Sequence, residues 1–240
     1  MSSTIRLYFP DKIQSDLSSH LTNEQTHYVK DVMRLKVGDT ISIFNTFGEW
    51  SAFIQSYEKN GAKIKIMDKV RGKDNEKNIW LAFSPIKQNP LNFIIQKGTE
   101  LGVQKFLPIL SERTIAREIN VKRIKKIIVE ASEQSNRISI PVINKLVSLK
   151  NFLSEFPKAG SLIFCDINSD ETDLKNIISK KKQGPICILI GPEGDFSEKE
   201  RQLIIEKKEI FSLSLASNIL RAETAAIAAV TIVNYHLNFN

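Results

Sequence analysis

Residues 71–78 form a run of eight without an apolar side chain, and the hydrophobic pattern differs on its two sides. Before this run, apolar and polar residues alternate, as they do in half-buried β-strands. After it, short apolar runs alternate with segments of helical spacing, which is typical of a parallel sheet covered by helices on both faces. A polar segment between two such patterns has the composition of a linker. We therefore predict two domains, residues 1–72 and residues 73–240.

The first 70 residues predict a small β-barrel or meander, preceded by one helix. Residues 39–70 alternate in strand fashion, and Asn60-Gly61 and Phe47-Gly48 are hairpin turn signals. Thr22 is a candidate cap for a helix over residues 23–35. The residues of this helix expected to face inward are Val29, Val32 and Met33.

The second part of the chain predicts an α/β domain with a mostly parallel sheet. The predicted strands are residues 79–83, 103–110, 161–166, 185–190 and 210–215. One predicted helix covers residues 91–101 and ends at Gly102, a natural C-terminal cap. A long amphipathic helix begins at about residue 121, with Ile124, Ile127, Ile128 and Ala131 inward and Arg123, Lys125 and Lys126 outward.

Charge and composition narrow the functional classes. The formal net charge is +7, and the excess lies in residues 81–160, which hold 13 lysines and arginines against 6 acidic residues. Such a stretch suits a polyanion such as RNA, although a solvated lysine-rich surface explains it equally well. No apolar run approaches the roughly 20 residues of a membrane span, and no secretion signal is visible, so we expect a cytoplasmic protein. The scattered histidines and two cysteines predict no metal site.

One candidate ligand loop is Gly191-Pro192-Glu193-Gly194, which directly follows an apolar run. Its two glycines allow a sharp turn and a close approach of the backbone to a ligand. Ser197 and Glu200 form a capping box, so the next helix is expected to begin at about Glu198. A tight strand-to-helix turn without any ligand is the plainer alternative.

The second candidate loop surrounds Arg221, and we expect the two loops to lie side by side where the parallel strands end. An arginine at a helix N-terminus opposes the helix macrodipole, so Arg221 is expected to meet a negative group. Glu223 suits the dipole better, and its alternative role is a capping carboxylate paired with Arg221.

Six motifs follow one another along the chain. They are Val32-Met33-Arg34-Leu35 with Gly38-Asp39, Gln96-Lys97-Gly98-Thr99-Glu100-Leu101-Gly102, Ser111-Glu112-Arg113, Glu130-Ala131-Ser132-Glu133-Gln134-Ser135-Asn136-Arg137, Gly191-Pro192-Glu193-Gly194, and Ile219-Leu220-Arg221-Ala222-Glu223-Thr224-Ala225. In this order they resemble the RsmE family of bacterial ribosomal RNA small-subunit methyltransferases, which belongs to the SPOUT class. Six ordered motifs are far more specific than either loop alone.

The resemblance implies a fold and a reaction. Family members have an N-terminal PUA-like barrel and a C-terminal α/β domain tied in a trefoil knot, and they act as homodimers. They transfer a methyl group from S-adenosylmethionine to N3 of a uridine in 16S ribosomal RNA. A catalytically silent RNA-binding or ribosome-assembly protein is the rival reading. A nucleotide-phosphate nest at Gly191 to Gly194 is a third, weakened by the absence of the lysine and hydroxyl of a P-loop.

The resemblance also assigns residues. For catalysis we expect Arg221 to stabilise negative charge on the uracil and Glu223 to accept the N3 proton, with Glu193 as the substitute base. The predicted cofactor contacts, which are otherwise plain core positions, are Leu189, Ile190, Gly191, Pro192, Glu193, Gly194, Leu215, Ala216, Ile219, Leu220 and Ala225. The motifs also predict Arg34, Lys97, Arg113 and Arg137 as RNA contacts, and charge alone adds Arg6, Lys36 and Arg117; each is otherwise a solvated cation.

Two positions depart from the family pattern. Asp195 stands where family members usually have glycine, so it adds a carboxylate and removes conformational freedom. Residues 216–218 lack the cation that usually precedes the Ile-Leu-Arg segment, because Asn218 occupies that position. These changes leave the predicted fold and cofactor class intact and affect the RNA contact at position 218.

Overall fold

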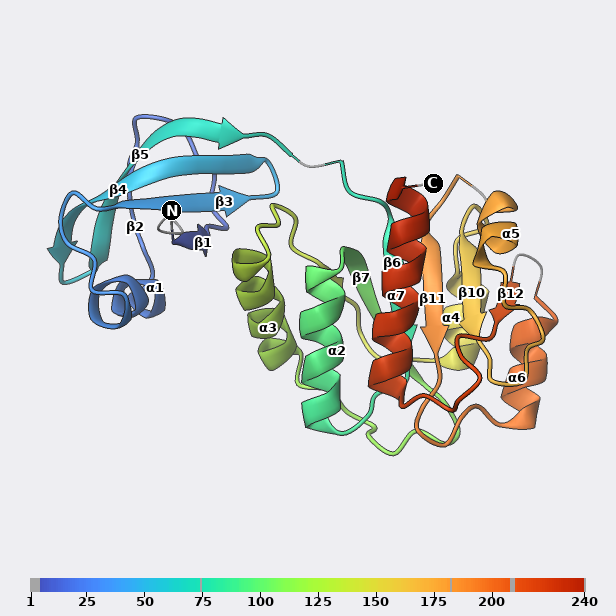
Figure 1. Ribbon diagram of the computed structural model, residues 1–240. Helices are drawn as coiled ribbons and strands as arrows, with labels where there is room; N and C mark the ends of the chain where they lie inside the picture. The colour runs from blue at the N-terminus through green and yellow to red at the C-terminus, as the bar shows by residue number, and fades with distance from the viewer. Residues whose placement is uncertain (1–4, 74, 182, 208–209, 240) are drawn as a thin grey trace. The chain divides into compact units, whose positions relative to one another are not determined.

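The computed structural model describes residues 5–73, 75–181, 183–207 and 210–239 (Figure 1). The contacts between residues divide the chain into two compact units. The first comprises Met1–Asn75 and Ser132–Ile140, and the second comprises Glu76–Ala131 and Pro141–Asn240. The domain boundary after residue 72 stays a prediction. None of the helices in the described ranges is both long and apolar enough to cross a membrane.

The first unit contains a five-stranded sheet with the order β1-β3-β4-β5-β2. Its strands are β1 (Arg6–Tyr8), β2 (Ser18–His20), β3 (Thr40–Asn45), β4 (Gly48–Glu58) and β5 (Gly61–Arg71). All pairings are antiparallel except that of β1 with β3. Both predicted hairpins are confirmed, since Asn45 pairs with Gly48 and Glu58 pairs with Gly61. Among the described residues, the edge strands β1 and β2 do not pair with each other, so the strand pairing does not close into a barrel.

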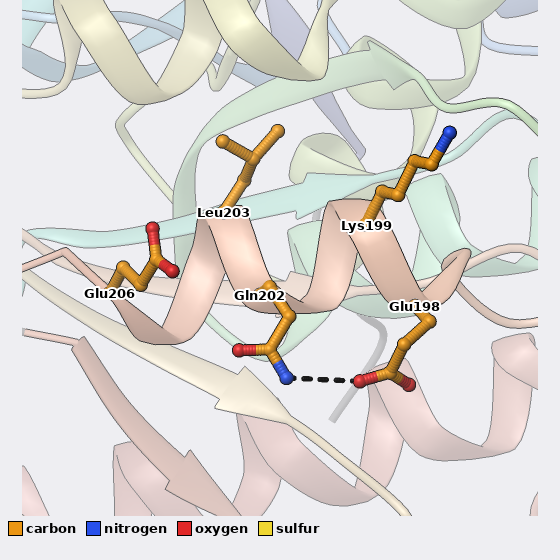
Figure 2. A pocket seen from close by; sticks show the side chains of 5 residues that line it. All are labelled: Glu198, Lys199, Gln202, Leu203 and Glu206. Atoms are coloured by element: carbon orange, nitrogen blue, oxygen red, sulfur yellow. Dashed lines mark hydrogen bonds between the residues drawn. The ribbon is translucent and has the colours of Figure 1, made fainter.

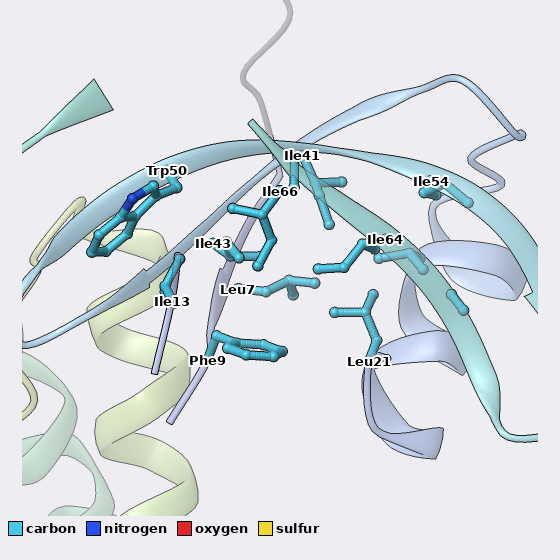
Figure 3. Packing of buried hydrophobic residues seen from close by; sticks show 13 residues of the cluster. Leu7, Phe9, Ile13, Leu21, Ile41, Ile43, Trp50, Ile54, Ile64 and Ile66 are labelled. Atoms are coloured by element: carbon cyan, nitrogen blue, oxygen red, sulfur yellow. The ribbon is translucent and has the colours of Figure 1, made fainter. Parts of the chain in front are cut away.

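One apolar cluster fills the concave side of this sheet (Figure 3). Alternate residues of β3, β4 and β5 point into it, because successive side chains of a strand face opposite ways. Leu7 from β1 and Leu21 after β2 complete it from the two edges. The members labelled in the figure are Leu7, Phe9, Ile13, Leu21, Ile41, Ile43, Trp50, Ile54, Ile64 and Ile66.

The predicted helix over residues 23–35 is shorter and changes its geometry. Thr22 caps α1 (Asn23–His27) with a complete capping box, as predicted. The chain then continues as the π-helix η1 (Tyr28–Val32), in which the Met33 N–H donates to the Tyr28 carbonyl at 2.9 Å. The wider turn rotates the following residues, so Val29 is buried but Val32 and Met33 are exposed. The inward orientation predicted for Val32 and Met33 was therefore wrong.

The second unit is built on a parallel sheet with the order β12-β10-β11-β6-β7-β8, and β9 also pairs with β7. Its strands are β6 (Ile79–Phe83), β7 (Val103–Leu110), β8 (Val142–Ile143), β9 (Val147–Ser148), β10 (Ser161–Cys165), β11 (Ile186–Ile190) and β12 (Ile210–Leu213). All described pairings are parallel, so the carboxyl ends of the strands meet along one edge. This confirms the predicted parallel α/β arrangement.

Helices cover both faces of this sheet, as predicted (Figure 1). On one face α2 (Gln88–Glu100) packs against α7 (Ala222–Phe239), and α7 contacts β11 and β6. On the other face α4 (Leu149–Glu155) and α6 (Glu198–Ile205) contribute Phe152 and Ile204 to a core with Leu162 and Leu189. The remaining helices are α3 (Val121–Gln134) and α5 (Leu174–Ser179). Gly102, with a φ of +95°, ends α2 as expected.

One strand lies between the two strands that precede the motif loops. β10 pairs with β11 on one side and with β12 on the other, so β11 and β12 are not direct neighbours in the sheet. The predicted side-by-side placement of the two loops stays a prediction, because strand pairing places the strands and not the loops that follow them. After β12 the chain returns along α7 to β11 and β6, which lie on the other side of β10.

Candidate active site

The loop after β11 turns at Glu193 and Gly194, directly before Asp195. Asp195 has a φ of +60°, whereas neither Gly191 nor Gly194 has a positive φ. The Asp195 N–H donates to the Pro192 carbonyl at 2.9 Å, which closes the turn. A Cβ at position 191 would lie 3.1 Å from the Phe196 ring, so a larger residue there would need this ring to shift. Gly194 thus lies within the turn, as predicted, and the left-handed conformation falls on Asp195, the residue that departs from the family pattern.

Glu200, in the first turn of α6, joins this loop to the segment that follows β7. It is 6% exposed, and its Oε1 accepts a hydrogen bond from the Glu112 backbone N–H at 2.8 Å. Its Oε2 accepts from the Ser197 backbone N–H at 3.0 Å, which confirms the predicted capping box. Arg113 adds a second link, because its Nη1 donates to the Gly194 carbonyl at 2.8 Å. The Ser111-Glu112-Arg113 motif is thus fastened to the Gly191 loop at two points.

Asp166 holds the same helix from the other side. It directly follows β10, and its side chain is 1% exposed. Both Nε and Nη2 of Arg201 donate to its Oδ2, at 3.0 and 2.8 Å. Its Oδ1 accepts from the Asn168 backbone N–H at 2.9 Å. Glu200 and Arg201 are adjacent in α6, so consecutive residues of one helix bind the ends of two different strands.

The second motif loop leaves its backbone groups unpaired. Within the described chain, the backbone groups of residues 215–220 make no hydrogen bond to protein atoms. Ile219 is 84% exposed, Ala216 is exposed, and Leu215, Leu220 and Ala225 are half-buried. Free backbone groups beside an exposed apolar side chain suit a flat, hydrogen-bonding ligand such as adenine. The residues present therefore fit the predicted cofactor contacts here.

The three predicted catalytic residues lie in the loop after β11 and at the start of α7. Arg221 caps α7 through its carbonyl, which accepts from the Ala225 N–H at 2.8 Å, and its side chain is exposed. In the part of the chain that the structure describes, the side chains of Arg221, Glu223 and Glu193 form no hydrogen bond or ion pair. The alternative pairing of Glu223 with Arg221 is therefore not formed. The three side chains are available to a substrate.

The cofactor residues of the β11 loop divide into core and surface positions. Leu189 and Ile190 are buried in β11, and the Leu189 side chain belongs to the core cluster. Pro192 is buried, Gly191 is half-buried, and Glu193 and Gly194 are exposed. For the side chain of Leu189 the plainer alternative, a core residue, is thus the better description.

Arg6 and Arg137, two predicted RNA contacts, lie inside the first unit. Arg6 donates from Nε and Nη2 to Glu49, at 2.9 and 3.2 Å. Its remaining N–H groups donate to the carbonyls of Ser132, Glu133 and Arg137, at 3.1, 2.9 and 2.9 Å. Arg137 is buried, and its Nη2 donates to the Ser139 hydroxyl at 2.7 Å. All five N–H groups of Arg6 are occupied, so we correct both residues from RNA contacts to structural cations.

The other predicted RNA contacts are spread over the two units. Lys97 pairs with Glu100 at 2.8 Å in α2, and Arg113 holds Gly194 as described above. Arg34, Lys36 and Arg117 are exposed, and their side chains make no hydrogen bond or ion pair to any described residue. Arg34 also has a φ of +56°, an uncommon conformation for a residue other than glycine. These three remain available for a polyanion.

A shallow hollow of about 450 Å³ lies on the outer side of α6 (Figure 2). Its lining residues are Glu198, Lys199, Gln202, Leu203 and Glu206, all on the side of α6 opposite the buried Ile204. None of the predicted site residues lines it. The hollow is a feature of one exposed helix face and not of the motif loops.

Sequence reasoning missed Asp166, Arg201 and Glu112 and gave Glu200 only a capping role. Asp166 carried a signal, since a carboxylate directly after a buried parallel strand lies where ligands usually bind. Glu112 acts through its backbone N–H, and no residue-type pattern reveals such a contact. Arg201 was hidden within an ordinary charged helix.

Two families match the chain. The RNA methyltransferase domain matches residues 73–234, and the RNA methyltransferase PUA domain matches residues 21–67. The chain belongs to the RNA methyltransferase family. This confirms the family resemblance read from the six motifs.

Relatives of known sequence or structure cover nearly the whole chain. A ribosomal RNA small subunit methyltransferase E from Rickettsia conorii is 34% identical over 229 residues, which are 94% of this chain and 93% of the relative. The enzyme of that name from Neisseria gonorrhoeae, solved bound to S-adenosylmethionine, is 28% identical with a TM-score of 0.88 and covers 99% of this chain and 100% of its own. A putative methyltransferase from Legionella pneumophila, solved with the same cofactor, is 27% identical with a TM-score of 0.85 and 98% coverage of both chains.

Proposed function

We propose that this protein transfers the methyl group of S-adenosylmethionine to N3 of a uridine in 16S ribosomal RNA. The observation that carries the proposal is the loop 215–220, whose unpaired backbone groups and exposed Ile219 lead directly into Arg221. Family membership and the cofactor-bound relatives support it. The cofactor-contact residues are those expected from the motifs, with Leu189 contributing through its backbone alone.

Bound S-adenosylmethionine supplies a methyl group already activated on a sulfonium, so the protein's task is to position N3 and remove its proton. We assign the proton to the carboxylate of Glu223, with Glu193 as the substitute base. We assign Arg221 to the negative charge that develops on the uracil oxygens. As N3 binds the methyl carbon, the carbon–sulfur bond breaks and its electron pair stays on the now neutral sulfur.

Asp166, Arg201 and Glu200 support this chemistry from a distance. Among the described residues they form no hydrogen bond or ion pair with any of the three catalytic candidates, but they fasten α6 to the ends of β10 and β7. Because α6 begins where the Gly191 loop ends, these contacts fix the loop in one conformation. A fixed loop lowers the entropy lost when the cofactor binds.

Finer features of the family belong to the same proposal. We propose a trefoil knot in the second unit, supported by the return of α7 past β10 to β11 and β6. We propose a PUA-like barrel over residues 1–72, supported by the PUA match, and a SPOUT domain over residues 73–240. We also propose that the protein forms a homodimer and is located in the cytoplasm.

Two measurements test the function. Calorimetric titration with S-adenosylmethionine should show saturable binding, and a catalytically silent RNA-binding protein has no reason to bind it. Mass mapping of ribosomal RNA from cells lacking the protein should show the loss of one methyluridine, restored by the wild-type gene. An unchanged modification map would refute the proposed reaction.

A further inference from the structure

The first turns of α3 carry a dense group of exposed cations. Lys122, Arg123, Lys125 and Lys126 are all exposed, and Arg117 is exposed just before the helix. Successive helix residues are about 100° apart, so these four cations share an arc of about 160°. Ile124 and Ile128 are buried on the opposite side. We call Lys122, Arg123, Lys125 and Lys126 the α3 basic face.

This face works against the stability of its own helix. Lys122 is three and four residues from Lys125 and Lys126, and like charges at these spacings repel each other. The first turn of α3 contains no acidic residue, although the helix dipole favours negative charge there. A sequence selected only for a solvated helix surface would place acids at the start. Local rules are broken in this way mainly at functional sites.

Four of the seven predicted RNA contacts already bind groups within the protein. Arg6, Arg137, Lys97 and Arg113 all bind groups of the protein itself. Other cations of residues 81–160 are exposed, and α3 holds the densest exposed group of them in that range. A phosphodiester backbone is the polyanion whose evenly spaced charges fit a row of lysines and arginines.

We propose that the α3 basic face binds the phosphate backbone of the substrate RNA. The proposal rests on the proposed function, because it takes RNA as the substrate. Contacts of this type position the RNA without reading its sequence. They add affinity and salt dependence, whereas the reaction itself stays with the motif loops.

The test compares two triple variants of equal charge change. In the first, K122Q, R123Q and K125Q neutralise the α3 basic face and leave Lys126 in place. In the control, K175Q, K180Q and K181Q neutralise three exposed lysines of α5 and the turn after it. Affinity for 16S ribosomal RNA transcribed in vitro, and for purified small ribosomal subunits, is measured across a series of KCl concentrations. Cofactor affinity and melting temperature are measured in parallel.

We expect the α3 variant to lower the slope of log affinity against log salt by about 2 to 3, because each lost phosphate contact removes about 0.7 to 0.9. The control should keep the wild-type slope. The α3 variant should bind S-adenosylmethionine as the wild type does and should melt at the same or a higher temperature. An unchanged slope, an equal loss in the control, or a loss with subunits but not with naked RNA would overturn the proposal. Failure of the wild type to bind the cofactor would instead contradict the proposed function.

Discussion

The carboxylate of Glu200 accepts a hydrogen bond from the backbone N–H of Glu112, with an N···O distance of 2.8 Å. The two residues belong to segments that follow different strands, β7 and β11. The same carboxylate also caps its own helix through Ser197. One buried side chain thus fixes the position of the Gly191 loop relative to the neighbouring strand end.

Replacing Glu200 by glutamine should weaken both the fold and the cofactor site. The amide nitrogen cannot accept a hydrogen bond, so one backbone N–H loses its partner, at a cost of about 1–3 kcal/mol. Urea denaturation measures the free energy of unfolding, and calorimetry measures the Kd for S-adenosylmethionine, which should rise. Glu206→Gln on the exposed side of the same helix is the control and should leave both unchanged. Equal behaviour of the two variants would show that Glu200 does not position the loop.

Arg221→Ala should abolish methylation while leaving cofactor binding and the proposed homodimer intact. The side chain has no protein partner among the described residues, so its removal leaves no buried group unpaired. Single-turnover methylation of small ribosomal subunits measures the chemical step, and size-exclusion chromatography measures the oligomer. Lys199→Ala, an exposed cation on α6, serves as the control. An active Arg221→Ala enzyme would remove Arg221 from the proposed mechanism.

Because Asp195 has a positive φ, a variant with glycine at this position should be more stable than one with alanine. Both substitutions remove the carboxylate, which accepts from the Phe196 N–H at 2.7 Å, so their difference isolates the effect of a φ of +60°. Because a Cβ disfavours the left-handed conformation, Asp195→Gly should be more stable than Asp195→Ala by about 1 kcal/mol. Chemical denaturation of the two variants gives the comparison. If alanine proved equal or better, the loop would not have this conformation in solution.

Glu49 should make the first unit sensitive to acid. Burial alone would raise the pKa of Glu49, but hydrogen bonds from Arg6 and Arg71 outweigh it and lower the pKa below its ordinary value. The resulting stabilisation is complete above about pH 4.3, the ordinary value for glutamate, and is lost as the pH falls through the lower folded-state pKa. The free energy of unfolding is measured from pH 6 to pH 3. Its contribution from Glu49 should decrease as the pH falls below about 4.3.

Arg71→Gln is the comparison for this acid effect. It removes one of the two charged partners, namely the Nε donor at 2.8 Å from Glu49. The pKa of Glu49 should then lie nearer its ordinary value, and the fall in stability at acid pH should be smaller than in the wild type. If stability fell equally in both proteins at acid pH, the Glu49–Arg71 ion pair would not determine the loss of stability.

Local signals in the sequence were enough for the turns, caps and strands. The hairpins before Gly48 and Gly61, the capping boxes at Thr22 and Ser197, and the end of α2 at Gly102 all follow from residue types within a few positions of each other. These structures depend on short-range sterics and hydrogen bonds, so a single sequence contains their causes.

The strand order and the contacts of single cations depend on distant residues. Nothing near residues 186–190 or 210–213 indicates that β10 lies between β11 and β12. Arg6 reads as a free surface cation because its partners lie 43 and more than 120 positions away. The π-helix at Tyr28 similarly turned two residues outward that an ideal helical period placed inside. Glu112 acts through its backbone N–H, and side-chain types in a sequence do not predict such a contact.

The first unit contains two separate segments of the chain, and this determines when the unit can finish folding during synthesis. Residues 1–75 hold all five strands, but the unit includes residues 132–140 as well. Until those residues leave the ribosome, Arg6 lacks the three carbonyl groups that occupy most of its N–H donors. The N-terminal part of the nascent chain must therefore wait for more than 50 further residues of the second unit before its last cation is satisfied.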